Sequence, residues 1–168
     1  LRGNVGVEID TMLPATGATA SFVAPAFPQQ GRTTVDGVHR INGVPVAETE
    51  IGRDPLCPVR ESRLPVLLSS QSRLPVGHVN LACIENGPAA MADRIRMLLN
   101  RGCRHITFDA GHTAHLDAVT SLARDHFEKI LFVGSAGLAG SLSRMMAGEL
   151  PTPAAADRPR IAKWLFVC

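Results

Sequence analysis

Several features that mark specialised proteins are missing from these 168 residues. Cysteine occurs only four times, at wide spacing and without a Cys-x-x-Cys pair, so the sequence indicates neither a disulfide framework nor a zinc site, and reduced thiols are expected. No apolar run has membrane-spanning length, no signal-peptide pattern is present, and the net charge is only +2. We therefore expect a cytoplasmic protein without a nucleic-acid or membrane partner.

The overall composition is that of a folded domain. Hydrophobic residues make up 45% and charged residues 19%, which is typical of a globular protein with a sizeable core and argues against disorder. Fifteen of the 17 basic residues are arginine, whose planar guanidinium can bind carboxylate or phosphate through two hydrogen bonds. The composition thus weakly favours an oxyanion as ligand.

Strand-like and helix-like segments alternate from Val76 onward. The runs VGHVNLA, HITFDA and EKILFVG predict strands, and the segments after them place apolar residues at helical spacing, the last helix beginning near Leu138. This alternation predicts an α/β fold with three layers and a mainly parallel sheet. The residues expected on the buried faces of these helices are Met91, Ile95, Leu98, Leu99, Leu116, Val119, Ala123, Phe127, Leu142, Met145 and Met146.

The first half of the chain is less regular. A helix over residues 4–13, a strand in TASFVAP and a helix in SRLPVLLSSQ flank a long irregular loop or hairpin insertion over residues 31–59. Within the insertion, RINGVPV carries Asn-Gly between apolar residues, which is a hairpin signal. The inward residues of the first helix are expected to be Val5, Ile9, Met12 and Leu13.

We predict one domain over residues 1–150, followed by a linker over 151–160. Residues 161–168 are then the first strand of a further domain. Because the chain begins at Leu and stops in the apolar run WLFVC, we expect it to be part of a longer protein.

Ligands of open parallel sheets bind beyond the carboxyl ends of the strands, which draws attention to the residues that follow the predicted strands. Asp109 can orient or deprotonate a hydroxyl there, or it can simply cap the next helix. GSAGLAGS, from Gly134, matches neither the Walker nor the dinucleotide pattern, so it is either an anion-binding helix start or a tightly packed turn. His112 and His115 lack a third ligand, and we predict no metal site.

The insertion over residues 31–59 is dotted with aliphatic residues, which predicts that it is ordered against a core. Arg32, His39, Arg53 and Asp54 are its candidate binding residues, with hydroxyl groups at positions 33 and 34. Paired guanidinium groups, hydroxyls and a carboxylate suit a small polyhydroxy acid. Alternatively, the segment is a surface loop with internal ion pairs, or an arm that wraps a partner subunit.

Four stretches of the sequence together carry a family resemblance. LRGNVGVEI, the long insertion, VGHVNL and FVGSAGLAGSL jointly resemble the four-carbon acid sugar kinase family over essentially the whole chain. The resemblance implies a sugar-acid-binding N-terminal domain that lacks its first strand-helix segment. It also implies that a C-terminal nucleotide-binding domain holds ATP and Mg²⁺, and that phosphate passes to the terminal hydroxyl of threonate, erythronate or 3-oxo-tetronate.

The resemblance assigns roles to residues of each motif. Family motifs expected upstream, Asp-Asp-x-Thr-Gly and Lys-x-Asp-Ser-Thr, and a Gly-Ser turn expected downstream are missing, so the chain alone is expected to be inactive. A non-enzymatic sugar-acid-binding module and an oligomerisation or interaction domain, including a homo-oligomer, are the alternatives. The implied residues are Asp54 and Asp109 for catalysis, Arg2, Asn4, Arg32, Thr33, His39 and Arg53 for substrate binding, and Gly134, Ser135 and Gly137 near the transferred phosphate. An aspartate of the missing upstream segment is the alternative catalytic carboxylate.

Overall fold

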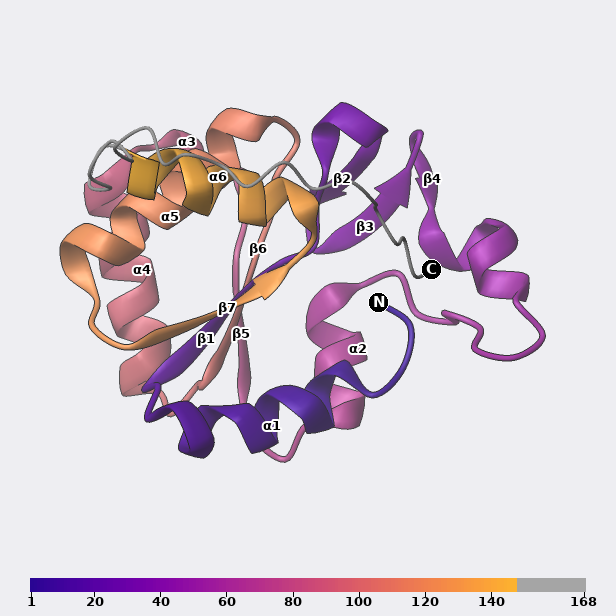
Figure 1. Ribbon diagram of the computed structural model, residues 1–168, viewed down its shortest axis with the longest axis horizontal. Coiled ribbons are helices and arrows are strands. Elements are labelled where there is room, and N and C mark those ends of the chain that lie inside the picture. The colour runs from indigo at the N-terminus through magenta and orange to yellow at the C-terminus, as the bar shows by residue number, and fades with distance from the viewer. Residues whose placement is uncertain (148–168) are drawn as a thin grey trace, which may run out of the picture.

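A four-stranded sheet forms the centre of the protein, seen in a computed structural model that describes residues 1–147 (Figure 1). The predicted parallel α/β sheet is confirmed, since every neighbouring pair of its strands runs in the same direction. The linker and final strand predicted over residues 151–168 lie outside the described residues. In spatial order the strands are β5 (Val76–Val79), β6 (His105–Phe108), β1 (Ala20–Ala24) and β7 (Ile130–Gly134).

Helices cover both faces of the sheet, which confirms the three-layer prediction (Figure 1). One face carries α1 (Val5–Thr16) and α2 (Leu64–Gln71). The opposite face carries α3 (Leu81–Glu85), α4 (Pro88–Asn100), α5 (Thr113–His126) and α6 (Ala136–Ala147).

Strand β1 joins the two hydrophobic cores. Successive side chains of a strand point to opposite faces, and all five residues of β1 are buried. Phe22 packs into the larger core, with its ring centroid 4.9 Å from that of Phe108, whereas Val23 packs with Ile9 and Leu13 on the other face. The apolar run TASFVAP is therefore explained by a strand that is buried on both sides.

The predicted helix faces are largely confirmed, with two exceptions at methionines. Met12 and Met146 were expected inside but are 46% and 48% exposed. Met12 lies about 100° around α1 from the buried Leu13, outside the stripe that faces the sheet. On α6, the inward stripe is formed by Gly137, Leu138 and the small polar Ser141, so Met146 lies beyond its edge.

The insertion is more regular than its composition predicts. Strands β2 (Arg32–Val35), β3 (Val38–Ile41) and β4 (Val44–Pro45) form a separate antiparallel sheet, here called the hairpin sheet. Its Asn-Gly turn at residues 42–43 confirms the predicted hairpin. A second turn, at Asp36-Gly37, was not predicted; both turns have positive φ at both central residues, as tight two-residue hairpins require.

A buried carboxylate attaches the hairpin sheet to the main sheet. Asp109, directly after β6, is fully buried and accepts hydrogen bonds from the backbone N–H groups of Asp36 (2.8 Å), Gly37 (2.9 Å) and Leu81 (3.0 Å). Beside it, the backbones of Thr34 and Ala110 exchange two hydrogen bonds of 3.0 and 2.9 Å. The hairpin sheet is thereby fixed at the carboxyl end of β6.

A polar network ties the elements together near the amino ends of the strands. The buried ring of His105 lies 2.8 Å from Oγ of Ser21 and 2.7 Å from a carboxylate oxygen of Asp10, which also accepts from the hydroxyl of Ser72. The order Ser-His-Asp matches that of a hydrolase triad. Ser21 is fully buried, and the network joins α1, β1 and β6.

Glycines of α6 give a first test of this packing. A Cβ at Gly137 would lie 2.5 Å from the carbonyl oxygen of Ala26, whereas at Gly140 its nearest neighbour is the flexible tip of Arg144 at 3.4 Å. We expect Gly137→Ala to lower the free energy of unfolding by about 1–3 kcal/mol. The matched Gly140→Ala should raise it by up to about 1 kcal/mol, because alanine favours the helix. Urea denaturation measures both; equal effects would contradict the close approach of α6 to Ala26.

Candidate functional site

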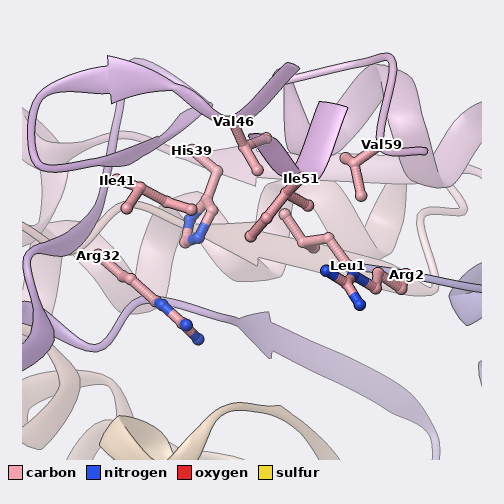
Figure 2. Close-up of a pocket in the computed structure, with 8 residues that line it drawn as sticks. All are labelled: Leu1, Arg2, Arg32, His39, Ile41, Val46, Ile51 and Val59. Atoms are coloured by element: carbon pink, nitrogen blue, oxygen red, sulfur yellow. The ribbon is translucent and has the colours of Figure 1, made fainter. Parts of the chain in front are cut away.

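Two adjoining cavities lie where the hairpin sheet meets the main sheet. The larger has a volume of about 530 Å³, and the smaller, of about 280 Å³, reaches Gly134 and Ser135 at the end of β7. Arg32 and His39 line both. The larger cavity, shown in Figure 2, is lined by Leu1, Arg2, Arg32, His39, Ile41, Val46, Ile51 and Val59.

Strand register explains which residues of the hairpin sheet face the cavities. Arg32 is paired with Ile41 and Thr34 with His39 across β2 and β3, and directly paired residues share one face of a sheet. Arg32, His39 and Ile41 therefore point to the cavity together, and Thr34 lies behind His39 with its Oγ1 3.0 Å from the ring Nδ1. Thr33, on the alternate face, lines neither cavity.

The larger cavity combines positive charge with an aliphatic wall. Among the described residues that line it, Arg2 and Arg32 are charged and none is a carboxylate. His39 is 4% exposed, and its pKa is lowered to about 4, first by burial and then by the positive charges of the amino terminus at Leu1 and of Arg32. The imidazole is thus neutral at neutral pH, and the cavity is suited to an anion with a carbon skeleton.

Asp54 shapes the loop that presents Arg2. One carboxylate oxygen accepts from the backbone N–H groups of Leu56 and Cys57, at 2.9 and 3.0 Å, and the other lies 3.2 Å from the Arg2 guanidinium. These backbone hydrogen bonds, and secondarily Arg2, lower the pKa of Asp54. Its neighbour Arg53 is exposed and lines neither cavity, so Arg2 and not Arg53 is the second guanidinium beside Arg32.

Asp109 and Asn4 lie outside both cavities. Burial alone would raise the pKa of Asp109, but its contacts with His78 and with the amides of Gly37 and Asp36 outweigh burial and lower it. Asn4 is exposed at the start of α1, where its carbonyl accepts from Glu8 N. The catalytic role of Asp109 and the substrate-binding role of Asn4 stay predictions.

The Gly134 turn lies beside the hairpin sheet. Gly134 and Ser135 line the smaller cavity together with Arg32 and His39. The Ser135 hydroxyl donates to the carbonyl of Ala26 (2.8 Å) and accepts from the backbone N–H of Gly137 (3.1 Å). Helix α6 begins at Ala136, two residues before the predicted start at Leu138. Gly137 itself packs against the backbone and lines neither cavity.

Sequence reasoning missed Glu8 and, although it named the hydroxyl at position 34, it did not place that hydroxyl against His39. Glu8 lines the smaller cavity from α1, and Thr34 holds His39 from behind. The Asp36-Gly37 turn would have revealed the pairing of Thr34 with His39, since it fixes the register of β2 against β3. No comparable sequence signal identifies Glu8.

The histidines at the start of α5 are engaged by the backbone. The ring Nδ1 of His115 accepts from the N–H groups of Gly111 and His112, at 3.2 and 3.3 Å. Within residues 1–147, no cluster of three or more histidine, cysteine or acidic side chains is arranged to hold a metal ion. In the same range, no helix combines the length and apolar character needed to cross a bilayer.

Comparison with known proteins identifies the family. The model of the sugar-binding N-terminal domain matches residues 1–142. The chain belongs to this family. As a sugar-binding N-terminal domain, it is similar to the first part of several kinases and spans about a third of their length.

Three curated relatives illustrate the similarity. A 3-oxo-tetronate kinase from Brucella melitensis is 32% identical over 85% of this chain and 32% of the relative. A D-threonate kinase from Salmonella typhimurium is 33% identical over 84% of the chain and 33% of the relative. A D-erythronate kinase from Heliobacterium modesticaldum is 34% identical over 71% of the chain and 27% of the relative.

Solved structures agree with the fold of this sugar-binding N-terminal domain. A protein from Salmonella typhimurium LT2, described as a putative tRNA synthase, superposes with a TM-score of 0.80 at 28% identity, over 86% of this chain and 34% of its own. A domain of unknown function from Bordetella bronchiseptica, described as a domain-swapped dimer with bound citrate, superposes with a TM-score of 0.67 at 33% identity. That match covers 85% of this chain and 33% of the other.

The Asp109 clamp yields a second prediction. Asp109→Asn keeps the shape of the side chain but removes the charge that three backbone N–H groups share, so the free energy of unfolding should fall by about 2–3 kcal/mol. Hydrogen exchange of the Gly37 amide should also become faster. Asp93→Asn is the matched control, because Asp93 has a 79% exposed side chain and pairs with Arg96 on its own helix. Equal effects of the two variants on the free energy of unfolding in urea would contradict an anchoring role for Asp109.

Proposed function

We propose that this chain is the substrate-binding portion of an ATP-dependent kinase that phosphorylates the terminal hydroxyl of a four-carbon sugar acid. Threonate, erythronate and 3-oxo-tetronate are the candidate substrates. The observation that carries the proposal is the larger cavity, whose only charged side chains among the described lining residues are Arg2 and Arg32. The names of the similar kinases support the same substrate class.

The sugar acid is bound by its carboxylate end and its carbon skeleton. Arg32 offers a planar guanidinium suited to bidentate contact with the carboxylate, and Arg2, held by Asp54, adds a second positive charge. The aliphatic wall formed by Ile41, Val46 and Ile51 packs against the carbon chain. A volume of about 530 Å³ is ample for a four-carbon acid and leaves room for part of a second reactant.

The terminal hydroxyl then points toward the smaller cavity. Gly134 and Ser135 line that space at the amino end of α6, where backbone N–H groups favour phosphoryl oxygens. Phosphoryl transfer depends mainly on positioning and charge neutralisation, so residues that hold the acid in place contribute directly to the rate.

ATP and Mg²⁺ are assigned to a further domain of the full-length protein. The described residues do not fit a Mg²⁺ site, since the wall of the larger cavity has no carboxylate and no three-residue metal cluster is formed within residues 1–147. In this proposal the binding domain extends over residues 1–150, and the linker and strand proposed after it lie outside the described residues. The chain alone is then inactive, and a homo-oligomer of the full-length protein is compatible with this arrangement.

Asp54 and Asp109 receive positioning roles in this proposal. Both carboxylates already accept backbone hydrogen bonds, and neither lines the cavities. Asp54 orients Arg2, and Asp109 holds the hairpin sheet that carries Arg32. The carboxylate that orients the attacking hydroxyl is expected elsewhere in the full-length protein.

A binding module without catalysis is the second candidate. The citrate bound to the Bordetella bronchiseptica protein is a hydroxylated carboxylate, the same chemical class as a sugar acid, and binding alone would need no nucleotide. A coupled ATP-consumption assay of the full-length protein with four-carbon acids separates the two: a kinase consumes ATP only when its acid is present, whereas a module binds the acid and consumes none.

Arg32 provides the third prediction. Arg32→Ala should weaken binding of the sugar acid by roughly 30- to 150-fold, equivalent to about 2–3 kcal/mol for a charged hydrogen-bonding contact, as measured by calorimetry of the full-length protein. Arg32→Lys should restore little, because an ammonium cannot make the two parallel hydrogen bonds. Arg60→Ala, at an exposed position outside both cavities, is the control. Unchanged affinity in Arg32→Ala would rule out this cavity as the acid-binding site.

A further inference from the structure

The pair formed by Thr34 and His39 stands at the back of both cavities. The two residues are direct cross-strand partners, and Thr34 is fully buried. Oγ1 of Thr34 lies 3.0 Å from Nδ1 of His39, which is a hydrogen-bond distance, but the distance alone does not say which group donates.

The threonine hydroxyl decides the direction of this bond. Its proton is buried and needs an acceptor, and Nδ1 of His39 is the only partner found for Oγ1 among residues 1–147. Nδ1 accepts only when it carries no proton. The pKa of His39 is lowered to about 4 by burial and nearby positive charges, so the neutral ring has one proton to place, and it resides on Nε2.

The other ring nitrogen opens onto the cavity. Nε2 of His39 has no hydrogen-bond partner among the described residues. It is not enclosed either, because the only fully buried side-chain nitrogen or oxygen without a partner in the described part of the chain is Nε2 of His78. Figure 2 shows the imidazole of His39 among the cavity side chains, with Ile41 and Arg32 on one side of it and Ile51 on the other.

We propose that Thr34 is a positioning residue that fixes His39 as an Nε2–H donor, so that the cavity selects ligands presenting an acceptor oxygen to it. With Arg2 and Arg32, every polar side chain on the described wall of the larger cavity is then a donor. Such a site favours an acid, whose carboxylate only accepts, over the neutral polyol of the same length. His39 in this state cannot take a proton from the substrate hydroxyl.

The identity of the ligand in this inference rests on the proposed function, whereas the tautomer of His39 does not. Imidazole ¹⁵N NMR of the unliganded full-length protein should show an unprotonated Nδ1 and a protonated Nε2 for His39. Thr34→Val preserves the shape and removes the hydroxyl, so it should give a mixture of tautomers. It should also weaken threonate binding about 5- to 10-fold, a modest loss for one neutral hydrogen bond, while leaving any binding of the neutral polyol threitol unchanged.

Two further variants complete the experiment. Thr34→Ser restores the hydroxyl and should return both the spectrum and the affinity to wild-type values. Thr120→Val is the matched control, since Thr120 is equally buried but its hydroxyl donates to the carbonyl of Asp117 within its own helix. It should change neither measurement.

The outcomes separate the inference from the proposed function. A protonated Nδ1 in the wild-type protein overturns the role of Thr34, and so does a Thr34→Val variant with unchanged tautomer and affinity. The expected tautomer in a protein that binds no four-carbon acid supports the geometry of the pair but contradicts the proposed substrate. Should Thr34→Val fail to fold, the wild-type spectrum and Thr34→Ser still decide the tautomer.

Discussion

The attachment of the hairpin sheet through Asp109 is the interaction on which the site depends. The residue is fully buried, and a lone carboxylate there would be strongly unfavourable. Three backbone N–H groups, two of them in the Asp36-Gly37 turn, satisfy it and join the hairpin sheet, β6 and α3 at one point. Because Arg32 and His39 belong to the hairpin sheet and Gly134 to the main sheet, this joint sets the geometry of both cavities.

The parts of the fold that sequence could predict are those governed by apolar periodicity. The strands, the longer helices and the Asn-Gly hairpin follow from local patterns. The exposure of Met12 and Met146 does not follow from such patterns, because helical spacing alone leaves the edges of an apolar stripe undefined. The composition of residues 31–59 predicts an irregular segment, whereas the Asp36-Gly37 turn sets the register of a regular hairpin sheet.

The candidate site was predictable in composition but not in arrangement. Arg2, Arg32, His39, Gly134 and Ser135 do line the cavities. Thr33 and Arg53 were chosen for their chemistry, yet strand alternation turns Thr33 to the other face and a 3₁₀ turn over Glu50–Arg53 leaves Arg53 exposed. Side-chain direction in such segments follows from tertiary contacts, such as those that Asp54 makes with Leu56 and Cys57, which no short sequence pattern encodes.

The two hydrophobic cores contain no residue from the hairpin sheet or from the loop that follows it. Ile41, Val46, Ile51 and Val59 line the cavity, and Val46 and Val59 are also buried, whereas Ile41 and Ile51 are only partly buried. Exchanging Ile41 or Ile51 should therefore change the shape of the cavity with little effect on the stability of the domain. Such substitutions can change the specificity of the cavity toward longer, shorter or differently branched acids while the fold stays the same.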